Sequence, residues 1–123
     1  MAISYEGPHL AAPVGSTGNN THNSLHVGSD YSSLVMQFVV EAIGATPTIT
    51  YKWQGSADGT NWYDVAYITD ASDTLAVSTR VATTVSAQIQ FTSNPSARRY
   101  KYYRVVTSAN TNVTYRAEIY TAD

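Results

Sequence analysis

Cysteine is absent from this chain of 123 residues, which excludes disulfide bonds, thiolate zinc sites and cysteine nucleophiles. Charge is also scarce, because only 13% of the residues are charged and the formal net charge is −2. A protein that grips a polyanion normally carries a clustered excess of positive charge. Binding to nucleic acid is therefore not expected. The sequence also lacks a secretory signal and any run of roughly 20 apolar residues, so we expect no membrane partner and a protein made in the cytoplasm.

Residues that favour helices are few. Leucine, methionine, lysine and glutamate together supply 11 residues, whereas valine, isoleucine, threonine and tyrosine supply 44. β-branched and aromatic side chains suit the pleated surface of a sheet better than a helix. The composition therefore predicts an all-β fold, and the length fits one domain of ordinary size.

The chain changes character near residue 31. Residues 1–31 are rich in glycine, serine, asparagine and alanine, and they contain neither lysine nor arginine. Their apolar residues follow no period of 2 or 3.6, which predicts an extended N-terminal arm with scattered anchors. We expect these anchors to contact a partner: Ile3, Leu10, Val14, Leu25 and Val27.

The arm has two alternative docking sites. Fully extended, 30 residues span roughly 100 Å, whereas a domain of the size of residues 32–123 has a radius of gyration near 12 Å. The arm is therefore long enough to add a strand to a neighbouring subunit. It can equally fold back as an edge strand of its own domain, and both alternatives stay open.

Residues 32–123 show the two-residue period of strands. In the first strand, Leu34, Met36, Phe38 and Val40 are predicted to point into the core. Residues 44–47 are predicted to turn the chain, and Asp58 and Gly59 to close a hairpin. We predict a sandwich of about seven strands, immunoglobulin-like or jelly-roll-like. The predicted strands are residues 32–41, 48–54, 61–69, 75–84, 87–91, 99–107 and 112–121, the last two forming a hairpin around residues 108–111.

Two motifs resemble a known group of proteins. Residues 55–65, GSADGTNWYDV, and residues 99–106, RYKYYRVV, look like the G-S-x-D-G-x-x-W hairpin and Y-x-R-V strand of small β-sandwich domains in tailed-phage virion proteins. Related motifs occur in discoidin-like carbohydrate-binding domains and in immunoglobulin-like modules. The resemblance covers roughly residues 48–121.

The resemblance implies a structural role for the hairpin and a virion role for the protein. We expect Asp58 and Gly59 to close the turn, Trp62 to be largely buried against the sandwich, and Arg104 to lie over an aromatic ring. The group most resembled is the head decoration, or cement, proteins. These bind the major capsid protein or other virion proteins on the capsid exterior, often as trimers.

Candidate catalytic residues are few. All three histidines, His9, His22 and His26, lie in the predicted arm, and no G-x-S-x-G elbow is present. The spacing of His22 and His26 would suit zinc only on a helix, and none is predicted there. We therefore expect no enzyme activity, metal or cofactor.

One strand gathers positive charge. Arg98, Arg99, Lys101 and Arg104 supply four of the seven basic residues and alternate with tyrosines. This pattern occurs where single-stranded nucleic acid is gripped, but residues 32–123 carry equal numbers of basic and acidic residues. A contact with an acidic protein surface, or an ordinary exposed strand face, is the better interpretation.

The function expected from the sequence is therefore that of a non-enzymatic structural protein of a tailed-phage virion, with a capsid decoration protein as the first choice. A tail, neck or baseplate subunit is the alternative within this class. The alternative outside it is a carbohydrate-binding module, in which Trp53, Trp62 or a row of tyrosines would stack on sugar rings.

Overall fold

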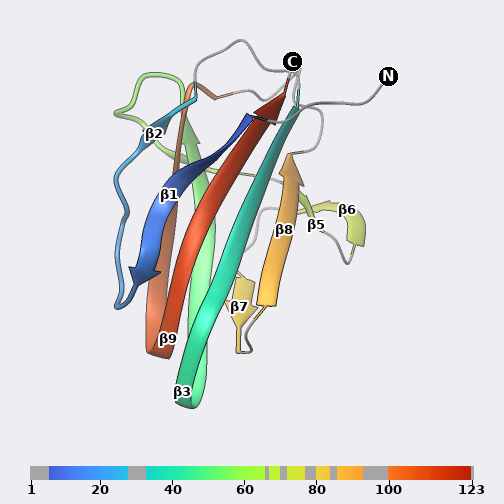
Figure 1. Ribbon diagram of the computed structural model, residues 1–123. Helices are drawn as coiled ribbons and strands as arrows, with labels where there is room; N and C mark the ends of the chain where they lie inside the picture. The colour runs from blue at the N-terminus through green and yellow to red at the C-terminus, as the bar shows by residue number, and fades with distance from the viewer. Residues whose placement is uncertain are drawn as a thin grey trace.

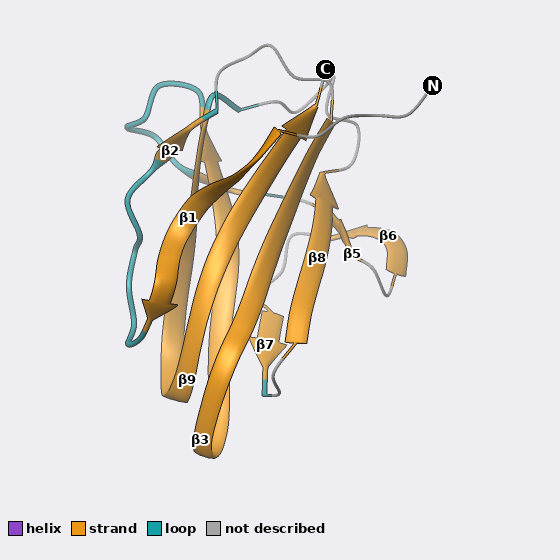
Figure 2. Cartoon of the chain, viewed as in Figure 1, coloured by secondary structure: helices purple, strands orange, loops and turns teal. Residues whose placement is uncertain are grey.

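The computed structural model describes residues 6–27, 33–65, 67–69, 72–76, 80–83, 86–92 and 100–122. Every regular element in these ranges is a β-strand, which confirms the all-β prediction (Figure 2). The strands are β1 (Glu6–Ser16), β2 (Leu25–His26), β3 (Ser33–Ser56), β4 (Tyr63–Asp64), β5 (Tyr67–Thr69), β6 (Ser72–Ala76), β7 (Arg80–Ala82), β8 (Ser86–Thr92) and β9 (Tyr102–Ala122).

The strands form one open antiparallel sheet. Its main path runs β1-β9-β3-β8-β5-β6, with β2 paired to β9 and both β4 and β7 paired to β3. The prediction of a sandwich built from seven strands in two sheets was therefore wrong. The physical reason is that β3 and β9 pair along nearly their whole length, from Ser33 opposite Ala122 to Ser56 opposite Tyr102. A continuous ladder joins strands that the sequence pattern assigned to different hairpins.

The two long strands bend together at one corner (Figure 1). Phe38 and Tyr51 are both in β3, yet their ring centroids lie 3.9 Å apart in a stacked arrangement. In a straight strand, 13 residues would separate them by about 43 Å. β3 therefore reverses its direction between these residues, and β9 follows it. The core lies between the two halves of one folded sheet.

Turn-forming residues of both strands meet at this corner. The register between β3 and β9 shifts between Ile43 and Thr48, opposite Val113 and Thr111. Thr46 and Asn112 have positive φ values of 44° and 54°, and the side-chain amide of Asn112 donates a 2.6 Å hydrogen bond to the carbonyl of Ala45. The predicted turn at residues 44–47 is thus one side of the corner. The hairpin predicted around residues 108–111 was wrong, because both of its arms pair with β3.

The buried side chains follow the predicted alternation. Leu34, Met36, Phe38 and Val40 are at most 2% exposed, as expected. The second half of β3 adds three more buried hydrophobic residues, Ile49, Tyr51 and Trp53. The second long strand, β9, contributes a matching set: Tyr103, Val105, Val113, Tyr115, Ala117 and Ile119.

The predicted N-terminal arm docks on its own sheet over residues 6–27. β1 pairs with the C-terminal half of β9, from Glu6 opposite Thr121 to Ser16 opposite Tyr115. After β1 the chain crosses to the other layer, where Thr21 bridges to Val106 and β2 pairs with Tyr102 and Tyr103. The segment therefore follows β9 on both sides of the corner. Of the two alternatives, the structure shows the edge strand of the same domain. Residues 28–32, which contain the predicted boundary, lie outside the described residues.

The two tryptophans have different environments, and the expectation that Trp62 is largely buried is confirmed only in part. Trp53 is 0% exposed, whereas Trp62 is only partly buried at the end of the 57–61 loop. We expect Trp53→Ala to lower the free energy of unfolding by about 3–5 kcal/mol, because it leaves a large cavity. Trp62→Ala should cost only about 1–2 kcal/mol, since partial burial and one contact with Arg104 are lost.

Urea denaturation of both variants measures this difference directly. The two substitutions remove the same atoms, so each controls for the other. A larger loss in Trp62→Ala than in Trp53→Ala would contradict the assignment of Trp53 to the core.

Candidate partner-contact surfaces

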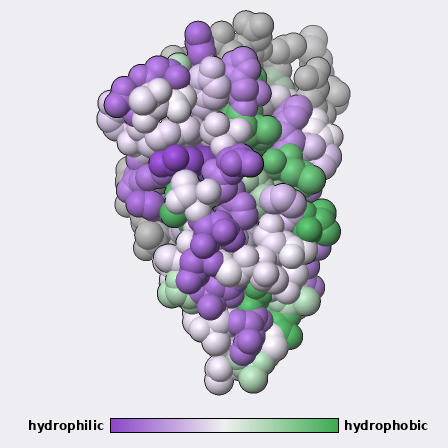
Figure 3. All heavy atoms as spheres, turned by 90° about the vertical axis from the view of Figure 1, so that its left-hand side faces the viewer, coloured by the Kyte–Doolittle hydropathy of each residue, from purple (hydrophilic) through white to green (hydrophobic). Residues whose placement is uncertain are grey.

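β1 is fixed to the core by small residues and exposes larger ones. Ala11 and Ala12 are 3% and 0% exposed, whereas Leu10 and Val14 are 46% and 64% exposed. Figure 3 looks onto the side that carries β1 and β2, where apolar atoms gather along one margin of a mostly polar face. β1 thus presents two apolar side chains to solvent on a strand that is itself held firmly.

The five predicted anchors divide into three groups. Leu10 and Val14 remain exposed. Leu25 and Val27 are partly buried and pack against the chain's own core, so they are used within the domain. Ile3 lies outside the described residues. A single sequence pattern could not separate these groups, because the exposed and docked anchors have the same residue types.

The backbone of β1 is a poor template for a further strand. Pro8 and Pro13 lack the N–H group that a ladder requires, and the pairing with β9 has three register shifts. Prolines and bulges are features by which edge strands resist added partners. Strand addition at this edge is therefore disfavoured, and a partner at β1 would contact side chains.

A second surface lies on the outer side of the layer formed by the C-terminal half of β3. Gln54 stands directly opposite Arg104 of β9 and Asp64 of β4. Arg104 Nε donates a 2.8 Å hydrogen bond to Gln54 Oε1, and Gln54 Nε2 donates one of 3.0 Å to Asp64 Oδ1. Lys52 Nζ lies 3.3 Å from the same carboxylate oxygen. The hydrogen bond from Gln54, with a contribution from Lys52, lowers the pKa of Asp64, so this carboxylate stays charged.

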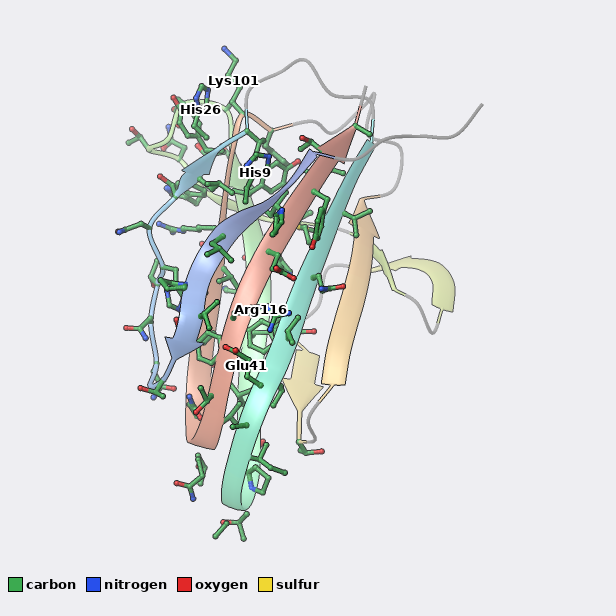
Figure 4. All side chains as sticks on the ribbon, viewed as in Figure 1. His9, His26, Glu41, Lys101 and Arg116 are labelled. Carbon is green, nitrogen blue, oxygen red and sulfur yellow. The ribbon has the colours of Figure 1, made fainter. Side chains whose placement is uncertain are left out.

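The guanidinium of Arg104 lies over the ring of Trp62, 4.2 Å from its centroid. This contact agrees with the expectation that Arg104 covers an aromatic ring. On the same strand, Tyr102 stacks against His26 of β2, with 4.8 Å between the ring centroids. Lys101 is exposed and lies at the same end of the molecule as His26 (Figure 4). Arg98 and Arg99 lie outside the described residues.

The loop that positions Trp62 is organised by Asp58. The backbone N–H groups of Asn61 and Thr60 donate to Asp58 Oδ1, each at 2.8 Å, and the Asn61 amide and Ser56 hydroxyl also donate to this carboxylate. The bonds from Asn61 and Thr60 are the largest causes that hold the pKa of Asp58 far below its usual range. Gly59 supports the turn with a φ of 79°, a conformation that glycine adopts without strain.

A third polar group lies on the outer side of the other layer and was not predicted from the sequence. Arg116 Nη1 is 3.6 Å from Glu41, and Arg116 Nε is 3.5 Å from Glu118. Glu118 also accepts a 2.8 Å hydrogen bond from Gln37. Figure 4 shows Glu41 and Arg116 beside each other on β3 and β9. Glu41 and Glu118 both pair with Arg116. The cluster forms because β3 and β9 are neighbours, and the sequence does not reveal this strand pairing.

Two hollows lie at the seam between the layers. One, of about 450 Å³, is at the corner and is lined by residues that include Gly18, Ile43, Asn110 and Asn112. The other, of about 440 Å³, lies between β1 and the residues before β2, with Leu10, Pro13 and His22 in its wall. Both are shallow openings rather than enclosed pockets.

His22 joins a buried polar chain behind the second hollow. Its Nε2 lies 2.6 Å from the hydroxyl of Tyr115, and that hydroxyl is 3.0 Å from Thr107 Oγ1. Thr107 in turn exchanges backbone and side-chain hydrogen bonds with Asn20. This chain ties residues 20–22 to the core. Burial lowers the pKa of His22, because the charged imidazolium loses hydration.

The described residues contain no cluster of histidine and acidic residues that could hold a metal ion. His22 and His26 contact different tyrosines, as given above, so the zinc interpretation of their spacing has no geometric support. No described helix is long and apolar enough to cross a membrane.

Comparison with known proteins identifies a fold but no family. No family model matches the chain, and no curated protein is similar to it in sequence. A solved structure that is similar is the SPBc2 prophage-derived protein YomS, with a TM-score of 0.71 over 98% of this chain and 96% of that chain. The chain shares its fold with a prophage-derived protein. At 7% identity, the likeness to YomS extends to the fold alone.

The position of His22 predicts a pH-dependent stability. The pKa of His22 is lowered in the folded state from its ordinary value of 6.5. Once the pH falls below this ordinary value, the unfolded chain therefore binds more protons than the folded chain. The contribution of His22 is therefore complete above that value and is lost as the pH falls below it. We expect the free energy of unfolding, measured with urea at about pH 8 and about pH 5, to fall less in His22→Gln than in the original protein.

His26→Gln is the matched control, since His26 is exposed and its removal leaves the His22 site intact. An identical pH dependence in the original protein and His22→Gln would show that the buried chain is not sensitive to the charge of His22.

Proposed function

We propose that this chain is a non-enzymatic structural protein of a tailed-phage virion, and that it decorates the outer shell of the capsid. The observation that carries the proposal is β1, a strand docked by alanines that leaves Leu10 and Val14 46% and 64% exposed. Apolar side chains that gather on a surface mark contact sites for other proteins, and we assign that role to Leu10 and Val14. The fold shared with the prophage-derived YomS supports a phage context.

The partner in this proposal is the major capsid protein or a neighbouring copy of the chain, as in a trimer. The protein is made in the host cytoplasm and assembles on the capsid exterior. Because Pro8 and Pro13 disfavour strand addition, attachment occurs through the side chains of β1. A tail, neck or baseplate subunit would use the same surface on a different particle.

A non-enzymatic role is supported by the contacts of two of the three described histidines. His22 is committed to the hydrogen bond with Tyr115 and His26 to the stack on Tyr102. The carbohydrate-binding alternative loses one of its candidates, because Trp53 is 0% exposed and cannot stack on a sugar. Trp62 carries Arg104 over its ring, which leaves less aromatic surface for a sugar.

The test is to purify particles of the phage or prophage that encodes the chain and to detect the protein in them by mass spectrometry. We expect the protein to remain with the particles through a density gradient. The double variant Leu10→Ser and Val14→Ser should fold with an unchanged melting temperature but bind to stripped particles at least about tenfold more weakly, a loss of about 1.4 kcal/mol.

Ile43→Ser is the control, since Ile43 is also an exposed aliphatic residue, at 43%, but belongs to the corner of β3. It should bind as the original protein does. Absence of the protein from purified particles, or full binding by the double variant, would contradict the proposal. Binding of the original protein to a glycan array, with loss of that binding in Trp62→Ala, would instead favour the carbohydrate-binding alternative.

A further inference from the structure

Arg104 is the centre of a pre-arranged surface on the layer opposite to Glu41 and Arg116. Its side chain is held at two points, by the hydrogen bond from Nε to Gln54 and by the ring of Trp62 at 4.2 Å. Gln54 is oriented by Asp64, and Trp62 is positioned by the loop that Asp58 organises. A long arginine side chain normally loses rotamer entropy when it is fixed. Because Gln54 and Trp62 already hold the side chain of Arg104, part of this entropy is lost on folding and not on binding.

The two terminal amino groups of this guanidinium are available to a partner. The described contacts of Arg104 are the bond from Nε to Gln54 and the contact with Trp62, so within the described residues neither Nη atom has an acceptor. The nearby carboxylate of Asp64 is bonded to Gln54 and Lys52, and that of Asp58 accepts four hydrogen bonds from Ser56, Thr60 and Asn61. Neither carboxylate competes for the Nη groups.

The ligand chemistry that this geometry favours is a planar carboxylate. The edge of a guanidinium matches two carboxylate oxygens in a bidentate pair. A polyanion such as nucleic acid would need many unpaired cations, whereas Lys52 beside Gln54 is paired with Asp64, and the whole chain carries a net charge of −2. Among the described residues, the two Nη groups of Arg104 suit one carboxylate.

The residues around Arg104 are those of a protein interface. Trp62, Tyr102 and Arg104 belong to the three residue types enriched among the side chains that dominate binding energy. Tyr102 lies two residues before Arg104 and therefore on the same side of β9, where it stacks on His26. These aromatic rings can exclude water from a salt bridge formed at Arg104.

We propose that Arg104, held by Trp62 and Gln54, binds a carboxylate side chain on the acidic surface of a partner protein. The proposal concerns a surface distinct from the exposed side chains of β1. It is independent of the virion assignment, because it is tested with the isolated protein and a defined ligand.

The probe is an acetylated and amidated peptide of alternating glutamate and glycine, titrated into the full chain at constant ionic strength. The readouts are the NMR shifts of the Trp62 indole N–H and the Arg104 Nε–H. We expect both signals to move with a saturable dependence on the peptide, and not with the matched peptide in which glutamine replaces glutamate.

Arg104→Lys keeps the charge but removes the bidentate geometry, and it should weaken binding of the glutamate peptide at least about tenfold, or about 1.4 kcal/mol. Arg116→Lys is the matched control on the same strand, because Arg116 belongs to the other layer and pairs with Glu41 and Glu118. It should leave the affinity unchanged. Unchanged melting temperatures establish that both variants are folded.

Three results would overturn the proposal. The first is no saturable shift with the glutamate peptide, or the same shift with the glutamine peptide. The second is an unchanged affinity in Arg104→Lys. The third is tighter binding of a single-stranded oligothymidylate than of the glutamate peptide, which would assign the surface to nucleic acid.

Discussion

The continuous pairing of β3 with β9 is the constraint on which the rest of the structure depends. The two strands stay hydrogen-bonded from Ser33 opposite Ala122 to Ser56 opposite Tyr102, and they bend together at one corner. The bend stacks the ring of Phe38 on those of Tyr51 and Tyr115, with 3.9 Å and 5.1 Å between the ring centroids. Stacked aromatic rings from three segments thus close the folded sheet, and one hydrogen-bonded ladder supplies both layers of the core.

The remaining elements attach to the edges of this folded ladder. Residues 6–27 cover the outer edge of β9 in both layers, whereas β4, β7 and β8 pair with β3 on the other side, and β5 and β6 follow beyond β8. Figure 1 shows β1 and β2 along this edge. The N-terminal segment therefore protects β9 from unwanted pairing, and its own prolines protect β1. At this edge of the sheet, side chains rather than backbone are therefore left for contacts with other proteins.

The two candidate surfaces follow from this arrangement and differ in chemistry. β1 offers two exposed aliphatic side chains, Leu10 and Val14, which suit burial against an apolar surface. The Arg104 surface offers a fixed guanidinium between aromatic rings, which suits one specific ionic contact. Together they would give a structural protein both contact area and orientation, because apolar burial is non-directional whereas a bidentate ion pair is directional.

The sequence by itself determined the all-β class, the inward faces of the long strands and the turn at Asp58 and Gly59. These depend on local properties: the two-residue period of Leu34 to Val40, the small number of helix-favouring residues, and a loop whose hydrogen bonds come from its own neighbours. The predicted contact residues also included Leu10, Val14 and Arg104. Nothing in the sequence, however, distinguished the exposed Leu10 and Val14 from the partly buried Leu25 and Val27.

Only the tertiary structure decided how the strands are connected. The residues at 44–47 and 108–112 have turn chemistry, but turn chemistry alone cannot distinguish a hairpin from a corner at which two paired strands bend together. The choice depends on the register between β3 and β9, which is a contact between residues up to about 90 positions apart. The same long-range pairing placed the predicted arm on its own domain, set Gln54 between Arg104 and Asp64, and left Trp62 at the surface while Trp53 became part of the core.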